Sequence, residues 1–348
     1  QIVLRVETFS EIVQVEVPKH VIEEDSSASK TILDANALQR AVLADSGEGL
    51  ARIILTTPGW VPDDNGRIHA RGTASEILYV VDGIPIIDRL DTAFAPSLDP
   101  RAVQALEIVT GNIAAEYGNR LGAVVNVQNK SGMDQPFGGT VTINAGNFRR
   151  AEAALTFGGA INHQLAVSFS TLLSRSNRFL DPPSEENLNN RGGSIKLNGK
   201  LEWHPTEQDT VRVVLTGSGT DFQVPNRPEQ QLAGQRSRQE SRSTSQSIMW
   251  QHVWNPDTVT NGAVYRRVFR FRLEPSSFDT PISASQDRKH SQEGFLGSLS
   301  RQLGRHHIKV GLEFFRTPIQ ESFSFFITRP EEVEVTPVTA QFVRGNPF

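Results

Sequence analysis

A two-residue hydrophobic period runs through the C-terminal two thirds of this 348-residue chain. In residues 194–203, Ile, Leu, Gly, Leu and Trp occupy the odd positions, and Ser, Lys, Asn, Lys and Glu the even ones. Successive side chains of a strand point to opposite faces, so this stretch predicts a strand with one apolar and one polar side. The same pattern recurs in 139–145, 153–157, 165–170, 265–273 and 307–314, although Arg267 interrupts one apolar side.

The connections between these stretches alternate in length. Short turns fall at 159–163, 204–209, 255–260 and 303–307, and long, polar, Pro-containing loops at 174–192, 219–244 and 274–291. Alternating short turns and long loops are typical of a membrane β-barrel, and the short segment 147–150 is the exception. About nine strands can be counted. Bacterial barrels close with an even number, so the barrel is expected to be unfinished in this chain. Alternation alone also fits a soluble β-sandwich.

Composition excludes several classes of protein. The chain has no Cys, which rules out disulfides and thiolate metal sites. Its net charge of −4 provides no basic field for nucleic acid, and no stretch approaches the ~18 apolar residues of a membrane-spanning helix. The chain opens without Met or a signal peptide and ends after a strand-like run. These ends predict a piece of a longer protein.

The first 135 residues have a different character. Alternation in 2–17 predicts short strands, and the polar segment 18–30 predicts a linker. From 31 to 135, two short helical stretches precede β-rich runs at 77–81 and 106–109, with the turn dipeptide Asp82-Gly83 between these runs. This region predicts a small mixed α/β domain.

The order of the motifs in this region closely resembles the plug domain of TonB-dependent outer-membrane receptors. The sequence of residues 115–132, "AEYGNRLGAVVNVQNKSG", resembles that of the Oar-like branch of these receptors, whose members carry a carboxypeptidase-regulatory-like domain before the plug. The motifs are Arg71-Gly72, Val81-Asp82-Gly83-Ile84-Pro85, Glu107 to Gly111, Tyr117-Gly118 and Val125-Asn126-Val127.

The resemblance implies a fold and a division of the chain. An α+β plug domain (31–135) is followed by antiparallel transmembrane strands (136–348), about nine of the twenty-two that the family barrel contains. Residues 1–17 would be the tail of the regulatory-like β-sandwich domain, and 18–30 a linker. Trp203, Trp250 and Trp254 would then belong to the aromatic girdle beside the short turns.

The resemblance also implies a function without catalysis. A receptor of this family takes up a scarce siderophore, carbohydrate or peptide through the outer membrane, with TonB, ExbB and ExbD as energy-coupling partners and the plug on the periplasmic side. No cofactor, metal or nucleic acid is expected. The plug motif and gating candidates are Arg71, Gly72, Asp82, Gly83, Pro85, Glu107, Gly111, Glu116, Tyr117, Gly118, Arg120 and Asn126. Of these, Arg71, Glu107, Glu116 and Arg120 are expected to bridge to charges on the barrel wall. A weaker resemblance to a TonB box falls on Glu11, Ile12, Val13 and Val15.

Other interpretations compete with these. The small residues of 111–118 lack the Gly-Lys-Ser/Thr ending of a phosphate loop, and are expected instead to let the plug approach the barrel wall closely. The adjacent His306 and His307 point to opposite faces of a strand, which disfavours a metal site. No catalytic constellation is present. A non-transporting surface or adhesion protein that keeps a plug, and a soluble β-rich binding protein, remain alternatives.

Overall fold

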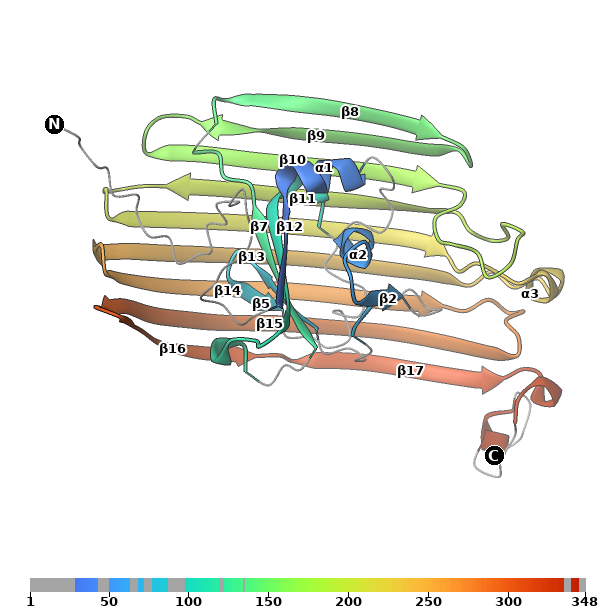
Figure 1. Cartoon of the computed structure of the whole chain (residues 1–348). Coiled ribbons are helices and arrows are strands. Elements are labelled where there is room, and N and C mark those ends of the chain that lie inside the picture. The colour runs from blue at the N-terminus through green and yellow to red at the C-terminus, as the bar shows by residue number, and fades with distance from the viewer. Residues whose placement is uncertain are drawn as a thin grey trace.

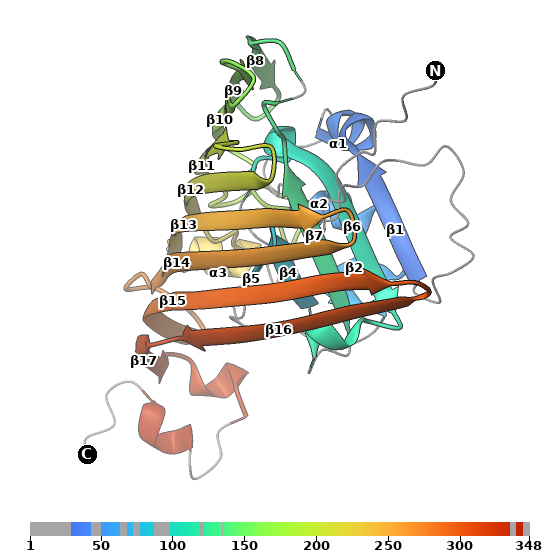
Figure 2. The same ribbon diagram turned by 90° about the vertical axis from the view of Figure 1, so that its left-hand side faces the viewer.

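The computed structural model describes residues 29–42, 50–62, 68–71, 77–86, 98–118, 122–133, 135–334 and 339–343. It consists of a small N-terminal sheet and a large curved antiparallel sheet, and the small sheet lies against the concave face of the large one (Figures 1 and 2). The predicted regulatory-domain tail (1–17), the TonB-box candidates Glu11, Ile12, Val13 and Val15, and the motif residues Gly72 and Arg120 lie outside the described residues.

The N-terminal unit is a five-stranded sheet in the order β1-β6-β7-β4-β5. The β4–β7 pair is parallel and the other pairs are antiparallel. Ser29 and Lys30 belong to β1, although they fall in the predicted linker. The elements are β1 (Ser29–Asp34), α1 (Ala35–Val42), α2 (Leu50–Leu55), β2 (Trp60–Pro62), β3 (Ile68–Ala70), β4 (Ile77–Val81), β5 (Ile84–Ile86), the 3-10 turn Pro100–Ala102, β6 (Val103–Gly111), the 3-10 turn Ala115–Tyr117 and β7 (Ala123–Asn129).

Local chemistry explains these elements. Asp34 caps α1, since its Oδ1 accepts a hydrogen bond of 2.7 Å from the Ala37 amide. Asp82 and Gly83 both have positive φ (47° and 83°), as the turn between β4 and β5 requires. The apolar sides of α1, α2 and the sheet meet in one core that contains Leu38, Ile54 and Leu106. The N-terminal unit therefore has a hydrophobic core of its own.

The large sheet begins at β8 and runs in chain order. Each strand pairs antiparallel with its neighbours, as in a meander. The strands are β8 (Gly138–Gly146), β9 (Arg150–Ala160), β10 (Leu165–Ser176), β11 (Gly192–Trp203), β12 (Asp209–Gln223), β13 (Arg238–Asn255), β14 (Thr258–Glu274), β15 (Ile282–Leu303), β16 (His306–Arg316) and β17 (Ile319–Ile327), and a short helix α3 (Pro228–Leu232) lies in the loop before β13.

The last two strands occupy one position in the sheet. β16 pairs with the second half of β15 and β17 with its first half, and both keep the same register. Pro318 separates them because it has no N–H to donate to the ladder. It still accepts a hydrogen bond from the Ser291 amide at 3.1 Å. The described part of the sheet thus has nine strand positions, in agreement with the sequence.

The two faces of the large sheet differ as the alternation predicts. On β11 the even residues Ser194 to Glu202 are buried against the N-terminal unit, and the odd residues Ile195, Leu197, Leu201 and Trp203 are exposed on the convex face. The tryptophans of the predicted girdle, Trp203, Trp250 and Trp254, are exposed next to the short turns.

On β14 the apolar side faces inward. The register with β13 places Val264 beside Ile248, and both are exposed on the convex face. Tyr265 follows Val264 directly and is therefore buried on the concave side, and the next residue, Arg266, lies on the convex side. The alternation identifies which residues share a face, but the neighbouring strands decide which face is inside.

The strands extend further into the predicted long loops than the sequence indicates. Residues 238–244 and 282–291, both predicted as loop, belong to β13 and β15. A strand of 22 residues such as β15 spans roughly 70 Å at ~3.3 Å per residue, far more than the ~25 Å apolar band of a membrane barrel. Beyond that band both faces contact water, so the hydrophobic alternation that reveals a strand is lost.

Candidate functional site

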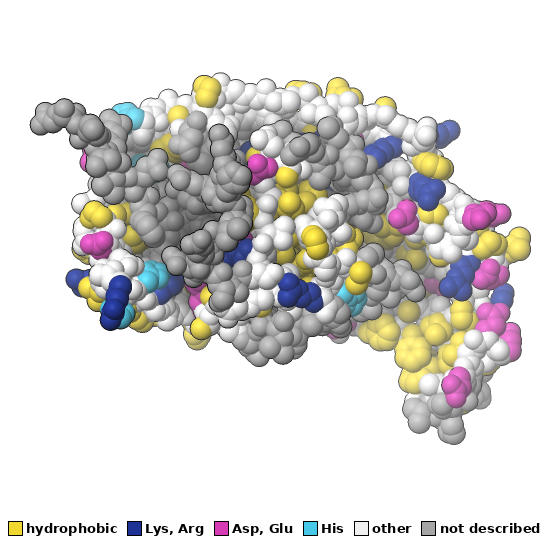
Figure 3. All heavy atoms as spheres, in the orientation of Figure 1, with side chains coloured by type: hydrophobic (Ala, Val, Ile, Leu, Met, Phe, Trp, Pro, Cys, Tyr) yellow, Lys and Arg dark blue, Asp and Glu magenta, His cyan; other side chains and the backbone are white. Residues whose placement is uncertain are grey.

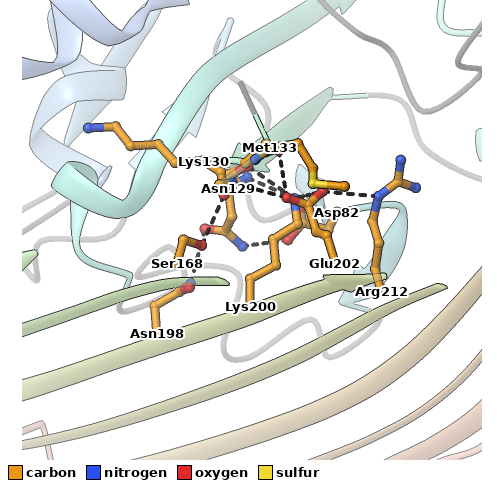
Figure 4. Close-up of polar contacts among 11 residues, drawn as sticks. Asp82, Asn129, Lys130, Met133, Ser168, Asn198, Lys200, Glu202 and Arg212 are labelled. Atoms are coloured by element: carbon orange, nitrogen blue, oxygen red, sulfur yellow. Dashed lines mark hydrogen bonds and ion pairs between the residues drawn. The ribbon is translucent and has the colours of Figure 1, made fainter. Parts of the chain in front are cut away.

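The contact between the N-terminal unit and the concave face of the large sheet buries a network of charged and polar side chains. Asp82, in the β4–β5 turn, accepts two hydrogen bonds from Asn129 at the end of β7: 2.9 Å from the backbone N–H and 2.6 Å from Nδ2. Asn129 in turn meets the wall, since its Oδ1 accepts a 3.1 Å bond from Asn198 of β11 (Figure 4). The turn and the strand end are thus fixed to each other and to the wall.

Lys200 of β11 places a positive charge at the centre of this contact. Its Nζ lies 3.9 Å from Asp82 Oδ1 and 3.6 Å from Glu202 Oε1, and donates to the Asn129 carbonyl at 3.3 Å. The Lys200 side chain is 7% exposed, and those of Asp82 and Glu202 are 6% exposed. A buried charge needs partners because desolvation is costly, and here two carboxylates and a carbonyl supply them.

Glu202 links the same wall strand to the segment that follows β7. Its Oε2 accepts from Ser131 Oγ at 2.5 Å and from the Gly132 amide at 3.1 Å, and its Oε1 lies 3.4 Å from Arg212 Nε (Figure 4). The backbone at Gly132 passes very close to β10: a Cβ there would stand 2.5 Å from the Val167 carbonyl oxygen and 3.1 Å from Ala166 Cβ. Only glycine fits this approach.

An apolar tip lies beside the polar network. Ile84 packs against Val214, Met249, Ala263 and Tyr265 of the wall. The carbonyl of the next residue, Pro85, accepts a 2.9 Å hydrogen bond from Gln292 of β15. The β4–β5 turn therefore contacts the wall through a carboxylate, an apolar side chain and a backbone carbonyl in succession.

A second ionic group joins the two units near β9. Arg101 donates from Nε to Asp99 Oδ1 at 3.1 Å and from Nη1 to Glu152 Oε1 at 2.8 Å. Asp99 also caps the 3-10 turn by accepting from the Arg101 amide. Asp99 and Glu152 side chains are 1% exposed, so this pairing is as buried as the first.

Comparison with known proteins identifies the N-terminal part of this arrangement. Residues 23–125 match the family described as the TonB-dependent Receptor Plug Domain. This chain carries a TonB-dependent receptor plug domain. The small sheet is the plug, the large sheet is the first part of the β-barrel wall, and the matched family consists of receptors rather than enzymes.

Similar proteins support the assignment over different lengths. The "TonB-dependent transporter Oar" of Myxococcus xanthus is 29% identical over 147 residues, which cover 40% of this chain and 14% of that protein. The alcaligin outer-membrane receptor FauA of Bordetella pertussis matches with a TM-score of 0.64 at 13% identity, over 88% of this chain and 49% of that one. The ferric yersiniabactin uptake receptor FyuA of Yersinia pestis matches with a TM-score of 0.68 at 15% identity, over 86% and 50%. The chain thus spans about half the length of these structures, and at such identity they show the fold alone.

The plug motifs fall into two groups by position. Asp82 and Pro85 lie at the barrel wall and Gly83 is exposed in the turn between them, whereas Gly111 and Asn126 lie within the plug sheet. A Cβ at Gly111 would touch Ser29 of β1 at 3.4 Å. The small-residue stretch 111–118 is mostly exposed, so the close approach to the wall is made by Gly132 rather than by that stretch.

The four charged residues expected to bridge to the wall behave differently from one another. Glu116 forms an ion pair of 2.9 Å with Lys309 of β16, on the wall. Glu107 instead pairs inside the plug, with Lys30 at 3.6 Å and with Asn126 Nδ2 at 3.0 Å, because its strand β6 lies between β1 and β7. Arg71 donates to Ser29 Oγ at 3.0 Å, also within the plug. Arg120 lies outside the described residues.

Two plug tyrosines are held neutral by their surroundings. Burial raises the pKa of Tyr79, in the plug core, well above its usual value. Burial, with the adjacent Glu116 carboxylate, raises the pKa of Tyr117 to about 12. Tyr117 packs against the cluster of Leu78, Val80, Val109 and Val124.

Within the described residues no group of three or more His, Asp or Glu could hold a metal ion, and no helix is long and apolar enough to cross a membrane.

Several residues of the polar contact between plug and wall were not among the candidates taken from the sequence. They are Asp99, Arg101, Asn129, Ser131, Lys200, Glu202 and Arg212. The signal for three of them was present: Lys200 and Glu202 belong to the polar row of β11, and Ser131 to the Lys-Ser-Gly that closes the plug motif. What the sequence could not supply is which charged plug residue reaches that row.

Proposed function

We propose that this chain is the plug and first barrel strands of an outer-membrane receptor that imports a scarce solute, driven by TonB, ExbB and ExbD. In this proposal the short turns and the plug face the periplasm, and the long loops of β10–β11 and β12–β13 face outward. The solute is a siderophore, carbohydrate or peptide, and a siderophore is favoured because several similar structures are named as siderophore receptors.

The polar contact between plug and wall is the observation that carries the proposal. A gate must be held in place without substrate and released when it is pulled. The Asp82–Asn129–Lys200–Glu202 network consists of hydrogen bonds and ion pairs that water can replace as the groups separate. In an apolar interface of the same size, water could not replace the lost contacts, because exposing apolar surface to water is unfavourable.

The network assigns gating roles within the plug. Asp82 and Pro85 hold the plug to the wall, Gly83 provides the positive φ of the turn that carries them, and the Glu116–Lys309 pair is a second, more exposed attachment on β16. Glu107 and Asn126 hold the strands of the plug sheet to each other. Arg71 fixes the start of β1, at Ser29, to the turn after β3. We place any TonB contact on the N-terminal side of β1.

A reversible tether between plug and wall tests the gate. Asn129 and Asn198 touch across the interface, and the natural chain has no cysteine to interfere. The double variant N129C/N198C is made in the native gene of the source cells. Its two cysteines are joined by a short, cleavable cross-linker with two thiol-reactive groups. Uptake is followed by mass spectrometry of the solutes removed from the medium, against a strain lacking the gene.

The expected result has three parts. The parent strain removes at least one solute that the deletion strain leaves behind, cross-linking the double variant abolishes that removal, and cleavage of the cross-linker restores it. The single variants N129C and N198C, treated identically, are the controls. If parent and deletion strain deplete the same solutes in low-iron medium, transport is excluded, and a role in surface attachment becomes the better explanation. If tethered cells transport normally, the plug is not the gate.

A further inference from the structure

A groove on the convex face of the barrel carries a set of arginines that the plug and the lumen do not use. It has a volume of about 1100 Å³ and lies over β10 to β13, close to the long loops. Pairing registers place Arg175, Gly193, Asp221 and Glu240 side by side on the same face as Ile195 and Leu197, the face that points away from the plug. The groove is therefore open to whatever surrounds the barrel.

The floor of the groove is made of bare backbone. Gly193, Gly217 and Gly219 occupy outward positions on two adjacent strands. A Cβ at Gly217 would meet only Leu197, at 3.9 Å, so the space above it is open and not filled by a neighbouring side chain. Glycine weakens a strand interior, and two of them two residues apart on one face create a depression that larger residues would fill.

The rim carries an excess of positive charge. Five arginines line the groove, Arg149, Arg175, Arg191, Arg238 and Arg242, against two carboxylates. Asp221 pairs with Arg238, and Glu240 pairs with Arg242. The side chains of Arg149, Arg175 and Arg191 make no ion pair with the described part of the chain. Three guanidinium groups are thus available to an external anion, and guanidinium matches the geometry of phosphate.

The lower edge of the groove is apolar. Ile195 and Leu197 line it, each 42% exposed, and the same face of β11 continues to Leu201 and Trp203. In a membrane barrel this face contacts acyl chains. A ligand that fills the groove therefore meets arginines at one end and the hydrocarbon band at the other.

We propose that this groove binds a phosphorylated lipid of the surrounding leaflet, with the phosphate on Arg149, Arg175 and Arg191 and an acyl chain along Ile195 and Leu197. Charge complementarity and continuity with the apolar band select a lipid over a free anion. The proposal depends on the barrel being embedded in a membrane but not on transport, so failure of the uptake experiment leaves it standing.

The test uses the receptor purified from its own outer membrane in detergent. Native mass spectrometry measures the fraction carrying added lipid A, a phosphorylated glycolipid, for the parent and for R175Q/R191Q. Each basic group near a membrane surface contributes about 1 kcal/mol, so the double variant should bind at least about tenfold more weakly. R301Q/R305Q, which removes the same charge beside a short turn, is the matched control and should bind like the parent.

A second variant separates shape from charge. Gly217→Val fills the floor, and its added Cβ makes only ordinary contacts, so the barrel should fold and shift on boiling like the parent while its lipid binding falls. Equal binding by the parent and both groove variants would overturn the proposal. So would a loss of equal size in R301Q/R305Q, or displacement of the lipid by inorganic phosphate alone, which would indicate an anion site without a lipid component.

Discussion

Replacing Lys200 with methionine probes whether the buried polar network holds the plug. Methionine keeps much of the length and volume of the side chain, and removes its charge and the hydrogen bond that it donates to the Asn129 carbonyl. Lys200 is 7% exposed and is the cation shared by Asp82 and Glu202. Removing one partner from a buried ion pair typically costs about 3–5 kcal/mol.

The surviving contacts reduce that figure. Asp82 keeps both hydrogen bonds from Asn129, and Glu202 keeps Arg212, Ser131 and the Gly132 amide. We therefore expect K200M to weaken plug docking by about 2–3 kcal/mol. With a urea dependence of about 1–3 kcal/mol per molar, the plug should be released at a urea concentration roughly 1–2 M lower.

The assay is urea-dependent cleavage of the plug by protease in the detergent-solubilised receptor, under conditions where the barrel still shifts on boiling. K309M is the matched control, because it removes the same charge from the Glu116 pair, whose side chains are 34% and 44% exposed. An exposed pair contributes about 0–1 kcal/mol, so K309M should move the midpoint by much less. Equal midpoints for K200M and the parent, or equal shifts for K200M and K309M, would refute the reasoning.

Three further outcomes follow from other parts of the structure. Ile84→Ala removes the apolar tip from its wall pocket and should cost about 2–4 kcal/mol of docking, seen in the same protease assay, whereas Ile84→Val should cost only about 1. Gly132→Val places a side chain against the Val167 carbonyl, so the plug should be cleaved even without urea, while Gly262→Val, whose added Cβ would make only an ordinary contact of 3.8 Å with Trp250, is a control for folding of the barrel. The pKa of Tyr117 is raised to about 12 in the folded plug and lies near 10 in an unfolded chain, so the unfolded chain loses its proton first and plug stability should fall as pH rises from 10 to 12. Tyrosinate absorbance of the parent and of Y117F, with protease sensitivity over the same range, checks this; an identical pH dependence in Y117F would contradict it.

The sequence predicts the elements of this fold well where one residue pattern decides the outcome. The strand Ile77–Val81 agrees with the run expected there, two short helices precede it as expected, and the polar residues of β11 share one face as alternation predicts. The strands beyond the apolar band are missed, because water on both faces removes the alternation. In those parts only the pairing with neighbouring strands identifies a strand, as it does for Arg238 opposite Glu274.

The candidate site is less predictable than the fold. Family motifs mark Asp82 and Pro85, which do reach the wall, but they mark Glu107 equally, and Glu107 is paired within the plug. A match to a family motif does not show whether a residue holds the plug sheet together or binds the plug to the barrel wall. That difference depends on which plug strand lies next to which barrel strand, and this long-range packing leaves no pattern within either segment.

The proline between β16 and β17 has a mechanical consequence for the outer rim. The Pro318 carbonyl accepts a hydrogen bond from the Ser291 amide, but proline has no N–H to donate in return. The Ser291–Pro318 pair, between β15 and the strand beside it, therefore has one hydrogen bond instead of two. Below this pair β16 presents the apolar residues Ile308, Val310, Leu312 and Phe314 on its outward side, and above it β17 presents Gln320, Ser322 and Ser324. The Ser291–Pro318 pair thus lies where the outward surface changes from apolar to polar. We therefore expect β17 to move relative to β16 about Pro318 more easily than the two halves of an unbroken strand would.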